Sequence, residues 1–153
     1  MRLQNKVAVV TASTRGIGAA IVETFTREGA KVYMAVRNLE KAQEMAERLN
    51  AEGGQVYCVY NDATKQETYK TMIEEVAQKE GRIDILVNNY GGSDPRIDLD
   101  IKLTTYEDFI QTLDQNIGSV FIASQAVIPH MAKNGGGSII HFSSIGGIRP
   151  DLS

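Results

Sequence analysis

The sequence predicts an α/β fold with a doubly wound parallel sheet, because two kinds of apolar pattern alternate along the chain. Five short apolar runs, rich in β-branched residues and bounded by Gly, Asn or charged residues, are too short for helices. These predicted strands are Val7 to Val10, Val32 to Val36, Val56 to Tyr60, Ile83 to Val87 and Ser138 to Phe142. Helical patterns lie between them, so the strands are expected to run parallel, with right-handed crossovers and helices on both faces.

Each predicted helix places apolar residues three and four positions apart, which is typical of one buried face. The inward residues of the first helix are Ile17, Ala20, Ile21, Thr24 and Phe25, and those of the second are Leu39, Ala42, Met45, Ala46 and Leu49. The third runs from about Lys65 to Glu80, and its inward residues are Tyr69, Met72, Ile73 and Val76. A long fourth helix runs from about Thr104 to Lys133, with the inward series Phe109, Leu113, Asn116 or Ile117, Val120, Ser124 and Val127. We expect the strand order 3-2-1-4-5, with the first two helices on one face and the other two on the opposite face.

Length and composition favour one globular domain over residues 1–153. The net charge of −3 comes from 16 basic and 19 acidic residues that form no block of one sign, so we expect no nucleic-acid partner and no membrane partner. No apolar run reaches the ~18 residues of a membrane helix. Cys58 is the only cysteine, which leaves no internal disulfide and no zinc-ligand spacing, and a cytoplasmic protein without a metal is expected.

Composition alone would also allow a flavodoxin-like fold, so the decision rests on the loops that follow the strands. After the first strand, two glycines precede a helix, and free backbone N–H groups at the positive end of that helix can hold a pyrophosphate. An ordinary glycine-containing turn is the alternative. The expected dinucleotide contacts in this loop are Thr11, Ser13, Thr14, Arg15, Gly16, Ile17 and Gly18.

With Ala12 in place of its first glycine, this loop resembles the Thr-Gly-x-x-x-Gly-x-Gly motif of the short-chain dehydrogenase/reductase family. After the fourth strand, Asn88-Asn89-Tyr90-Gly91-Gly92 resembles the family's Asn-Asn-Ala-Gly. The resemblance covers the whole chain and implies a dinucleotide-binding Rossmann domain in which Asn89, Tyr90 and Gly91 pass beside the cofactor. Tyr90 replaces a small Ala, and it is expected either to shift the loop outward or to add an aromatic wall near the nicotinamide. Some bacterial bile-acid hydroxysteroid dehydrogenases of the family look similar here.

The residues after the second and third strands bear on the choice of cofactor. Val36 stands where a Rossmann domain that prefers NAD has an acidic residue for the ribose 2′-hydroxyl. The resemblance places Arg15 and Arg37 at one adenosine ribose, where two guanidinium groups suit a 2′-phosphate, although a lone arginine is more often a solvated surface charge. We therefore expect NADP(H) rather than NAD(H). Asp62 and Ala63 match the family's adenine contact, and an N-cap is the other interpretation of Asp62.

Two catalytic residues are implied by the resemblance. Asn116 matches an Asn at a helix kink whose backbone holds a water of the proton relay, and an exposed Asn is the alternative interpretation. Ser144 matches, better than Ser143, the serine that hydrogen-bonds the substrate carbonyl, although a serine here is commonly a turn residue. The family's Tyr and Lys would lie roughly a dozen residues or more beyond Ser144. The chain is therefore expected to be a partial member of the family, inactive by itself.

The resemblance implies an oxidoreductase that transfers hydride between NADP(H) and a small-molecule secondary alcohol or ketone, with a hydroxysteroid as one candidate. A reductase of 3-ketoacyl carrier proteins and a non-catalytic NADP-binding fragment stay open as alternatives. A full-length protein is expected to be a homo-oligomer, either a dimer or a tetramer. An uncovered fifth strand, with Ile139, Ile140 and Phe142, is expected to recruit other chains. His130 and His141 lack the partners of a catalytic triad or a metal site, so both are expected to be structural.

Overall fold

The computed structural model describes residues 1–145, and the end of the predicted domain at 146–153 lies outside the described residues. The strands form one parallel sheet in the order β3-β2-β1-β4-β5, which confirms the predicted topology. The strands are β1 (Val7–Thr11), β2 (Lys31–Val36), β3 (Gln55–Tyr60), β4 (Ile85–Asn88) and β5 (Ser138–His141). The helices are α1 (Gly16–Arg27), α2 (Leu39–Ala51), α3 (Glu67–Glu80), α4 (Tyr106–Leu113), the π-helix η1 (Asp114–Gly118) and α5 (Ser119–Lys133).

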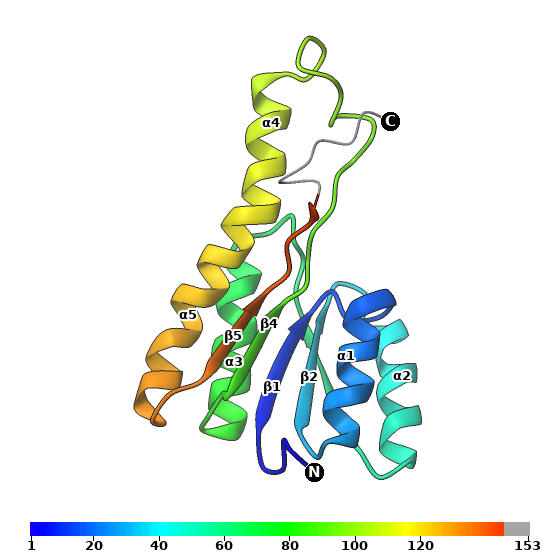
Figure 1. Ribbon diagram of the computed structural model, residues 1–153, viewed down its shortest axis with the longest axis vertical. Helices are drawn as coiled ribbons and strands as arrows, with labels where there is room; N and C mark the ends of the chain where they lie inside the picture. The colour runs from blue at the N-terminus through cyan, green and yellow to red at the C-terminus, as the bar shows by residue number, and fades with distance from the viewer. Residues whose placement is uncertain (146–153) are drawn as a thin grey trace.

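Helices cover both faces of the sheet (Figure 1). On one face, Val22 of α1 and Ala42 of α2 pack with Val10 of β1 in one buried cluster. On the other face, Ile73 of α3 and Val127 of α5 belong to a second buried cluster. The predicted placement of the helices is therefore confirmed. So is the buried face of the third helix, which includes Tyr69, Met72, Ile73 and Val76. The predicted face of the first helix is wrong: Ile17 is 60% exposed, and α1 instead buries Gly18 and Val22.

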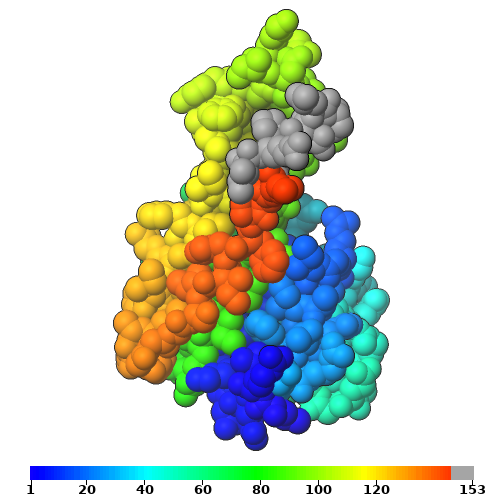
Figure 2. All heavy atoms as spheres, viewed as in Figure 1, coloured from blue at the N-terminus to red at the C-terminus, as the bar shows by residue number. Residues whose placement is uncertain are grey.

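The fourth helical segment differs from the prediction. Phe109 and Leu113, expected to face inward, are 50% and 37% exposed. They lie on α4, which rises past the carboxyl ends of the strands and projects from the body of the molecule (Figures 1 and 2). The π-helix η1 then adds a residue to the turn and rotates the buried face. As a result α5 buries Ser119, Ala123, Val127 and Met131, whereas Val120 and Ser124 of the predicted series are only half-buried.

β5 is an edge strand in the described part of the sheet. Ile140 and Phe142 are 38% and 41% exposed, while Ile139 packs against the cluster under α3 and α5. The association of this edge with other chains stays a prediction. No helix among residues 1–145 is long and apolar enough to cross a membrane.

Asp84 ties together the amino ends of three neighbouring strands. Its carboxylate accepts the Val7 N–H at 2.8 Å and two bonds from the Arg82 guanidinium at 3.0 and 2.5 Å. Its backbone N–H donates to the Val7 carbonyl, and its own carbonyl accepts the Ser138 N–H. Burial alone would raise the pKa of Asp84, but the bonds from Arg82 and Val7 hold the pKa below its usual range. Charged Asp84 therefore stabilises the start of β1, β4 and β5.

Asp84→Asn should lower the free energy of unfolding by about 2 kcal/mol at pH 7, because hydrogen bonds to a charged, mostly buried group are lost. The folded pKa of Asp84 is depressed, so its contribution is present above the unfolded value of about 3.9 and is lost as the pH falls through the folded value. The difference between parent and variant should then shrink between pH 5 and pH 3. Urea unfolding followed by circular dichroism at each pH measures this difference. Asp100→Asn is the control, because Asp100 accepts only N–H bonds from its own exposed turn, which Asn also accepts. A difference that stays constant with pH would contradict the assignment.

Candidate functional site

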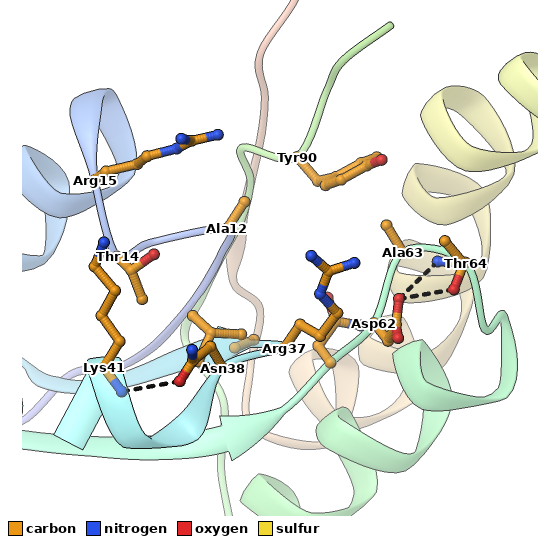
Figure 3. A pocket seen from close by; sticks show the side chains of 13 residues that line it. Ala12, Thr14, Arg15, Arg37, Asn38, Lys41, Asp62, Ala63, Thr64 and Tyr90 are labelled. Atoms are coloured by element: carbon orange, nitrogen blue, oxygen red, sulfur yellow. Dashed lines mark hydrogen bonds between the residues drawn. The ribbon is translucent and has the colours of Figure 1, made fainter. Parts of the chain in front are cut away.

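The loops after β1, β2, β3 and β4 meet at the carboxyl edge of the sheet and enclose a cavity of about 430 Å³ (Figure 3). Parallel strands bring these loops together because all their carboxyl ends lie at the same edge. Six of the predicted cofactor residues line the cavity: Thr14, Arg15, Arg37, Asp62, Ala63 and Tyr90. The lining also includes residues that the sequence analysis did not assign to the cofactor: Ala12, Ala35, Val36, Asn38, Lys41, Asn61 and Thr64.

Thr11 and Asn89 do not line the cavity; they hold its walls together. Thr11 is fully buried, and its Oγ1 accepts the N–H groups of Asn89 at 3.0 Å and of Tyr90 at 3.1 Å. The Asn89 Nδ2 in turn donates to the carbonyls of Thr11 at 3.3 Å and Ala12 at 3.1 Å. These bonds join the loop after β1 to the loop after β4. The structure therefore gives both residues a positioning role.

At two positions after β1, the backbone conformation or the close packing favours a residue with a small side chain or none. Ala12 has φ +51°, a left-handed conformation that glycine adopts more readily than alanine. Gly18 is buried at the start of α1, and a Cβ there would lie 2.6 Å from the Ala12 carbonyl oxygen and 2.6 Å from the Asn89 Nδ2. Gly18 thus allows α1 to pack directly against the bonded pair of loops.

The same loop leaves polar groups without partners. Ser13 is fully buried, and its Oγ has no hydrogen-bond partner among residues 1–145. α1 begins at Gly16, and the side chain of its N-cap residue, Arg15, makes no capping bond. The first N–H groups of a helix have no partner within the helix and attract anions. Gly16 and Ile17, both exposed, stand at this helix start as predicted for a phosphate-binding turn.

Three cationic side chains surround the cavity. Arg15 follows β1, Arg37 follows β2, and Lys41 lies in the first turn of α2 (Figure 3). None of them forms an ion pair with another residue in the described part of the chain. Lys41 was not among the residues predicted from the sequence; its signal is its position four residues after Arg37, at the start of the next helix. Asn38 fixes that start, because its Oδ1 accepts the Lys41 N–H at 3.0 Å.

Asp62 is the acidic side chain of the cavity lining. Its Oδ1 accepts the Thr64 N–H at 3.0 Å and the Thr64 hydroxyl at 2.9 Å. Burial alone would raise the pKa of Asp62, but the bonds from Thr64 and the charge of Arg37 hold the pKa below its usual range. The N-cap interpretation is wrong, because α3 begins later, at Glu67, with Gln66 before it. Asp62 closes a turn and keeps its charge at neutral pH.

Tyr90 lies with its ring in the wall of this cavity, on the side of Ala63 and above Arg37 (Figure 3). Its hydroxyl is 3.4 Å from the Gln115 Oε1. Two outcomes were expected for Tyr90, an outward shift of the loop or an aromatic wall near the nicotinamide. The structure shows an aromatic wall, but the ring lines the cavity that is also lined by Arg15 and Arg37.

Asn116 lies in the π-helix, at the predicted irregularity of the long helix. Its Nδ2 donates to the Gly92 carbonyl at 2.8 Å and the Thr112 carbonyl at 2.9 Å, and its Oδ1 accepts the Gly92 N–H at 2.9 Å. Asn116 is half-buried, so the alternative of an exposed Asn is wrong. A Cβ on Gly91 would lie 3.6 Å from the Asn116 Oδ1, so Asn116 holds the loop after β4 closely against the helix.

Ser144 is exposed and lies just beyond β5, three residues after His141. The Phe142 N–H donates to the Asn88 carbonyl, so the chain leaves β5 beside the end of β4. Ser144 therefore belongs to the same carboxyl edge as the cavity. The two histidines have structural contacts: His141 Nδ1 lies 3.1 Å from Asn88 Nδ2, and His130 lies 3.3 Å from a Glu74 carboxylate oxygen.

Comparison with known proteins shows one family. The model of the short chain dehydrogenase family matches residues 6–152. A 7alpha-hydroxysteroid dehydrogenase from Clostridium sardiniense is 48% identical over 99% of this chain and 58% of its own length. A 7alpha-hydroxysteroid dehydrogenase from Escherichia coli K12 is 34% identical over 95% of this chain and 55% of its own length. The chain thus spans a little more than half the length of these relatives.

Solved structures resemble the fold closely. A 7 alpha-hydroxysteroid dehydrogenase complexed with NADH and 7-oxo glycochenodeoxycholic acid has a TM-score of 0.87 at 33% identity, over 98% of this chain and 57% of its own. A metagenomic short-chain oxidoreductase in complex with NADP has a TM-score of 0.89 at 28% identity, over 99% of this chain and 67% of its own. These two neighbours hold different nicotinamide cofactors.

Gly18→Ala should lower the free energy of unfolding by about 1–3 kcal/mol, because the new methyl group meets backbone and a bonded amide rather than a movable side chain. Thermal and urea unfolding measure the effect. Gly92→Ala is the matched control, since a Cβ there meets no atom within 4 Å. Equal stability of the two variants would contradict the close packing of the two loops.

Proposed function

The chain belongs to the short-chain dehydrogenase family, and from this premise we propose that it binds NADP(H) for hydride transfer between the cofactor and a secondary alcohol or ketone. One observation carries the choice of NADP(H): three cations without ion pairs among the described residues surround one cavity. A 2′-phosphate would pair with them through charge-assisted bonds. No carboxylate takes the place of Val36, which also lines the cavity.

The loop after β1 fits the pyrophosphate of such a cofactor. The buried Ser13 Oγ without a described partner, the uncapped start of α1 and the absence of a side chain at Gly18 supply donors and close approach for an anion. Thr14 and Arg15 would then bind the phosphates and the adenosine ribose from this loop, and Arg37 and Lys41 from the loop after β2 and from α2. Asp62 and Ala63 would bind the adenine.

When bound, the nicotinamide ring supplies or accepts the hydride. Ser144 would donate a hydrogen bond to the substrate carbonyl oxygen and stabilise the negative charge that develops there. Asn116 acts as a positioning residue, because its amide holds both polar backbone groups of Gly92. Thr11 and Asn89 keep the loops after β1 and β4 at a fixed separation, so the cofactor and the substrate meet in one orientation.

A hydroxysteroid is the proposed substrate. Two relatives with 48% and 45% identity, over 99% and 94% of this chain, carry the name 7alpha-hydroxysteroid dehydrogenase. A 3-oxoacyl-[acyl-carrier-protein] reductase from Thermotoga maritima is 34% identical, which supports the alternative substrate class less strongly. Binding of a panel of bile acids, compared with binding of a 3-ketoacyl thioester, tests this proposal without turnover, because the chain is expected to be inactive by itself. With Cys58 as the only cysteine, we propose the cytoplasm as its compartment.

A homo-oligomer is part of the proposal. Apolar side chains at helical spacing are exposed along the fourth helical segment: Ile110, Leu113, Ile117, Phe121 and Ile128. Ile117 and Phe121 are 64% and 62% exposed, which is unusual for large apolar residues on a free surface. A second copy of the chain would cover this stripe.

NADPH should bind more tightly than NADH, and Arg37→Asp should reduce that preference at least about tenfold, because a repulsive carboxylate replaces a donor of charge-assisted bonds. Lys41→Ala should reduce it about threefold, since a lysine contributes a point charge without the paired geometry of arginine. The fluorescence of the reduced nicotinamide measures both affinities, and the chain has no Trp to interfere.

Lys70→Asp controls for the change in net charge, because Lys70 is exposed on α3, outside the cavity lining. This variant should keep the parent's ratio of affinities. Equal affinity of the parent for NADPH and NADH would contradict the proposed cofactor.

Phe121→Glu should shift the protein towards monomers, because a carboxylate would be buried in the covered stripe without a partner. Analytical ultracentrifugation of parent and variant measures the change. Glu44→Ala, at an exposed position on α2, is a surface control that should keep the parent's assembly. A parent that is monomeric at high concentration would contradict the proposed assembly.

A further inference from the structure

Tyr90 has a fixed place at the end of β4. Its backbone N–H donates to the buried Thr11 Oγ1 at 3.1 Å, beside the bond from Asn89 to the same oxygen. The base of the side chain is therefore set by the contact between two neighbouring strands.

The far end of the Tyr90 side chain is held as well. Its hydroxyl lies 3.4 Å from the Oε1 of Gln115 in the π-helix. Burial raises the pKa of the phenol, Arg37 opposes this and Asp62 adds to it. Tyr90 is thus neutral at physiological pH and is anchored at both ends.

The ring faces a space with a particular chemistry. Ala63 contributes a methyl group, Asp62 a charged carboxylate, and Arg37 a cation, all in the lining of the same cavity (Figure 3). A flat ring that bears an amino group can pack against the apolar wall and donate to the carboxylate, and an attached phosphate can pair with the cations. These features match an adenine with a phosphorylated ribose better than a nicotinamide, whose reacting carbon must approach Ser144.

We propose that the adenine of the cofactor packs against the ring of Tyr90, so that Tyr90 determines affinity for the adenosine half of the cofactor. The inference rests on the proposed function, because it requires an adenosine ligand in this cavity. It adds a residue role that depends on Tyr90 itself, since the small side chain common at this place in the family would leave that wall of the cavity open. The face of the aromatic ring contacts the adenine and so increases the affinity, and the hydroxyl helps to hold the ring in place.

Isothermal titration with two ligands tests the role without any turnover: adenosine 2′,5′-bisphosphate and adenosine 5′-monophosphate. Tyr90→Ala should weaken binding of both ligands about tenfold, because contact between an aromatic ring and a base is worth at least about that factor. Tyr90→Leu, which keeps an apolar side chain without the ring, should weaken both about fivefold. Tyr90→Phe, which keeps the ring, should restore binding to within about twofold of the parent.

Tyr106→Ala is the matched control, because Tyr106 is 72% exposed on α4 and does not line the cavity. Urea unfolding of each variant shows whether it is folded at the titration temperature. Unchanged binding of both ligands by folded Tyr90→Ala would overturn the proposal, and so would a Tyr90→Phe variant as weak as Tyr90→Ala. If the parent binds both ligands equally while Tyr90→Ala weakens both, the NADP(H) preference fails and the role of Tyr90 stands. Binding of neither ligand by the parent would overturn both.

Discussion

The site depends on one buried hydroxyl. Thr11 Oγ1 accepts two backbone N–H groups from the loop after β4, and Asn89 of that loop donates back to the carbonyls of Thr11 and Ala12. β1 and β4 are neighbours where the strand order reverses, and helices leave them towards opposite faces of the sheet. In a doubly wound parallel sheet, a crevice lies at the carboxyl ends of the strands where the strand order reverses. Without bonds across it, the loops on its two sides would be joined only through the strands.

The two sides of this crevice carry different chemistry. The loops after β1 and β2 supply cations and the free start of α1, which suit the anionic parts of a dinucleotide. The other side carries the π-helix, whose Asn116 is bonded to Gly92 and whose Gln115 is bonded to Tyr90. A π-turn leaves irregular backbone and side-chain positions that a regular helix does not offer. The loop after β4 therefore connects the cationic side of the crevice to the side that holds the candidate catalytic residues.

The sequence predicts those parts of the molecule that follow from local pattern. The strands and the faces of the second and third helices are set by apolar periodicity, and Gly18 by the turn that it allows. The predicted face of the first helix was wrong, because α1 packs through Gly18 against two distant loops and so buries Gly18 and Val22. The predicted buried face of the fourth helix was wrong, because nothing in the apolar spacing marks the extra residue of a π-turn or the end of the sheet beneath Phe109. Lys41 was missed because its place beside Arg37 depends on where α2 begins. The side to which the ring of Tyr90 points depends on contacts with distant residues, and no local pattern contains them.

The distribution of charge explains why the cavity suits an anion although the whole chain is negative. Elsewhere in the described chain, many basic side chains pair with carboxylates, as Lys31 does with Glu80 and Arg82 with Asp84. Arg15, Arg37 and Lys41 form no such ion pair within residues 1–145 and lie around one cavity, where the Asp62 carboxylate is already bonded to Thr64. A phosphate bound there would supply a counter-charge and would accept hydrogen bonds from these side chains. Under the proposed function, ligand binding and folding are linked, and a ligand with a phosphate on the ribose would stabilise the fold more than one with a hydroxyl at the same place.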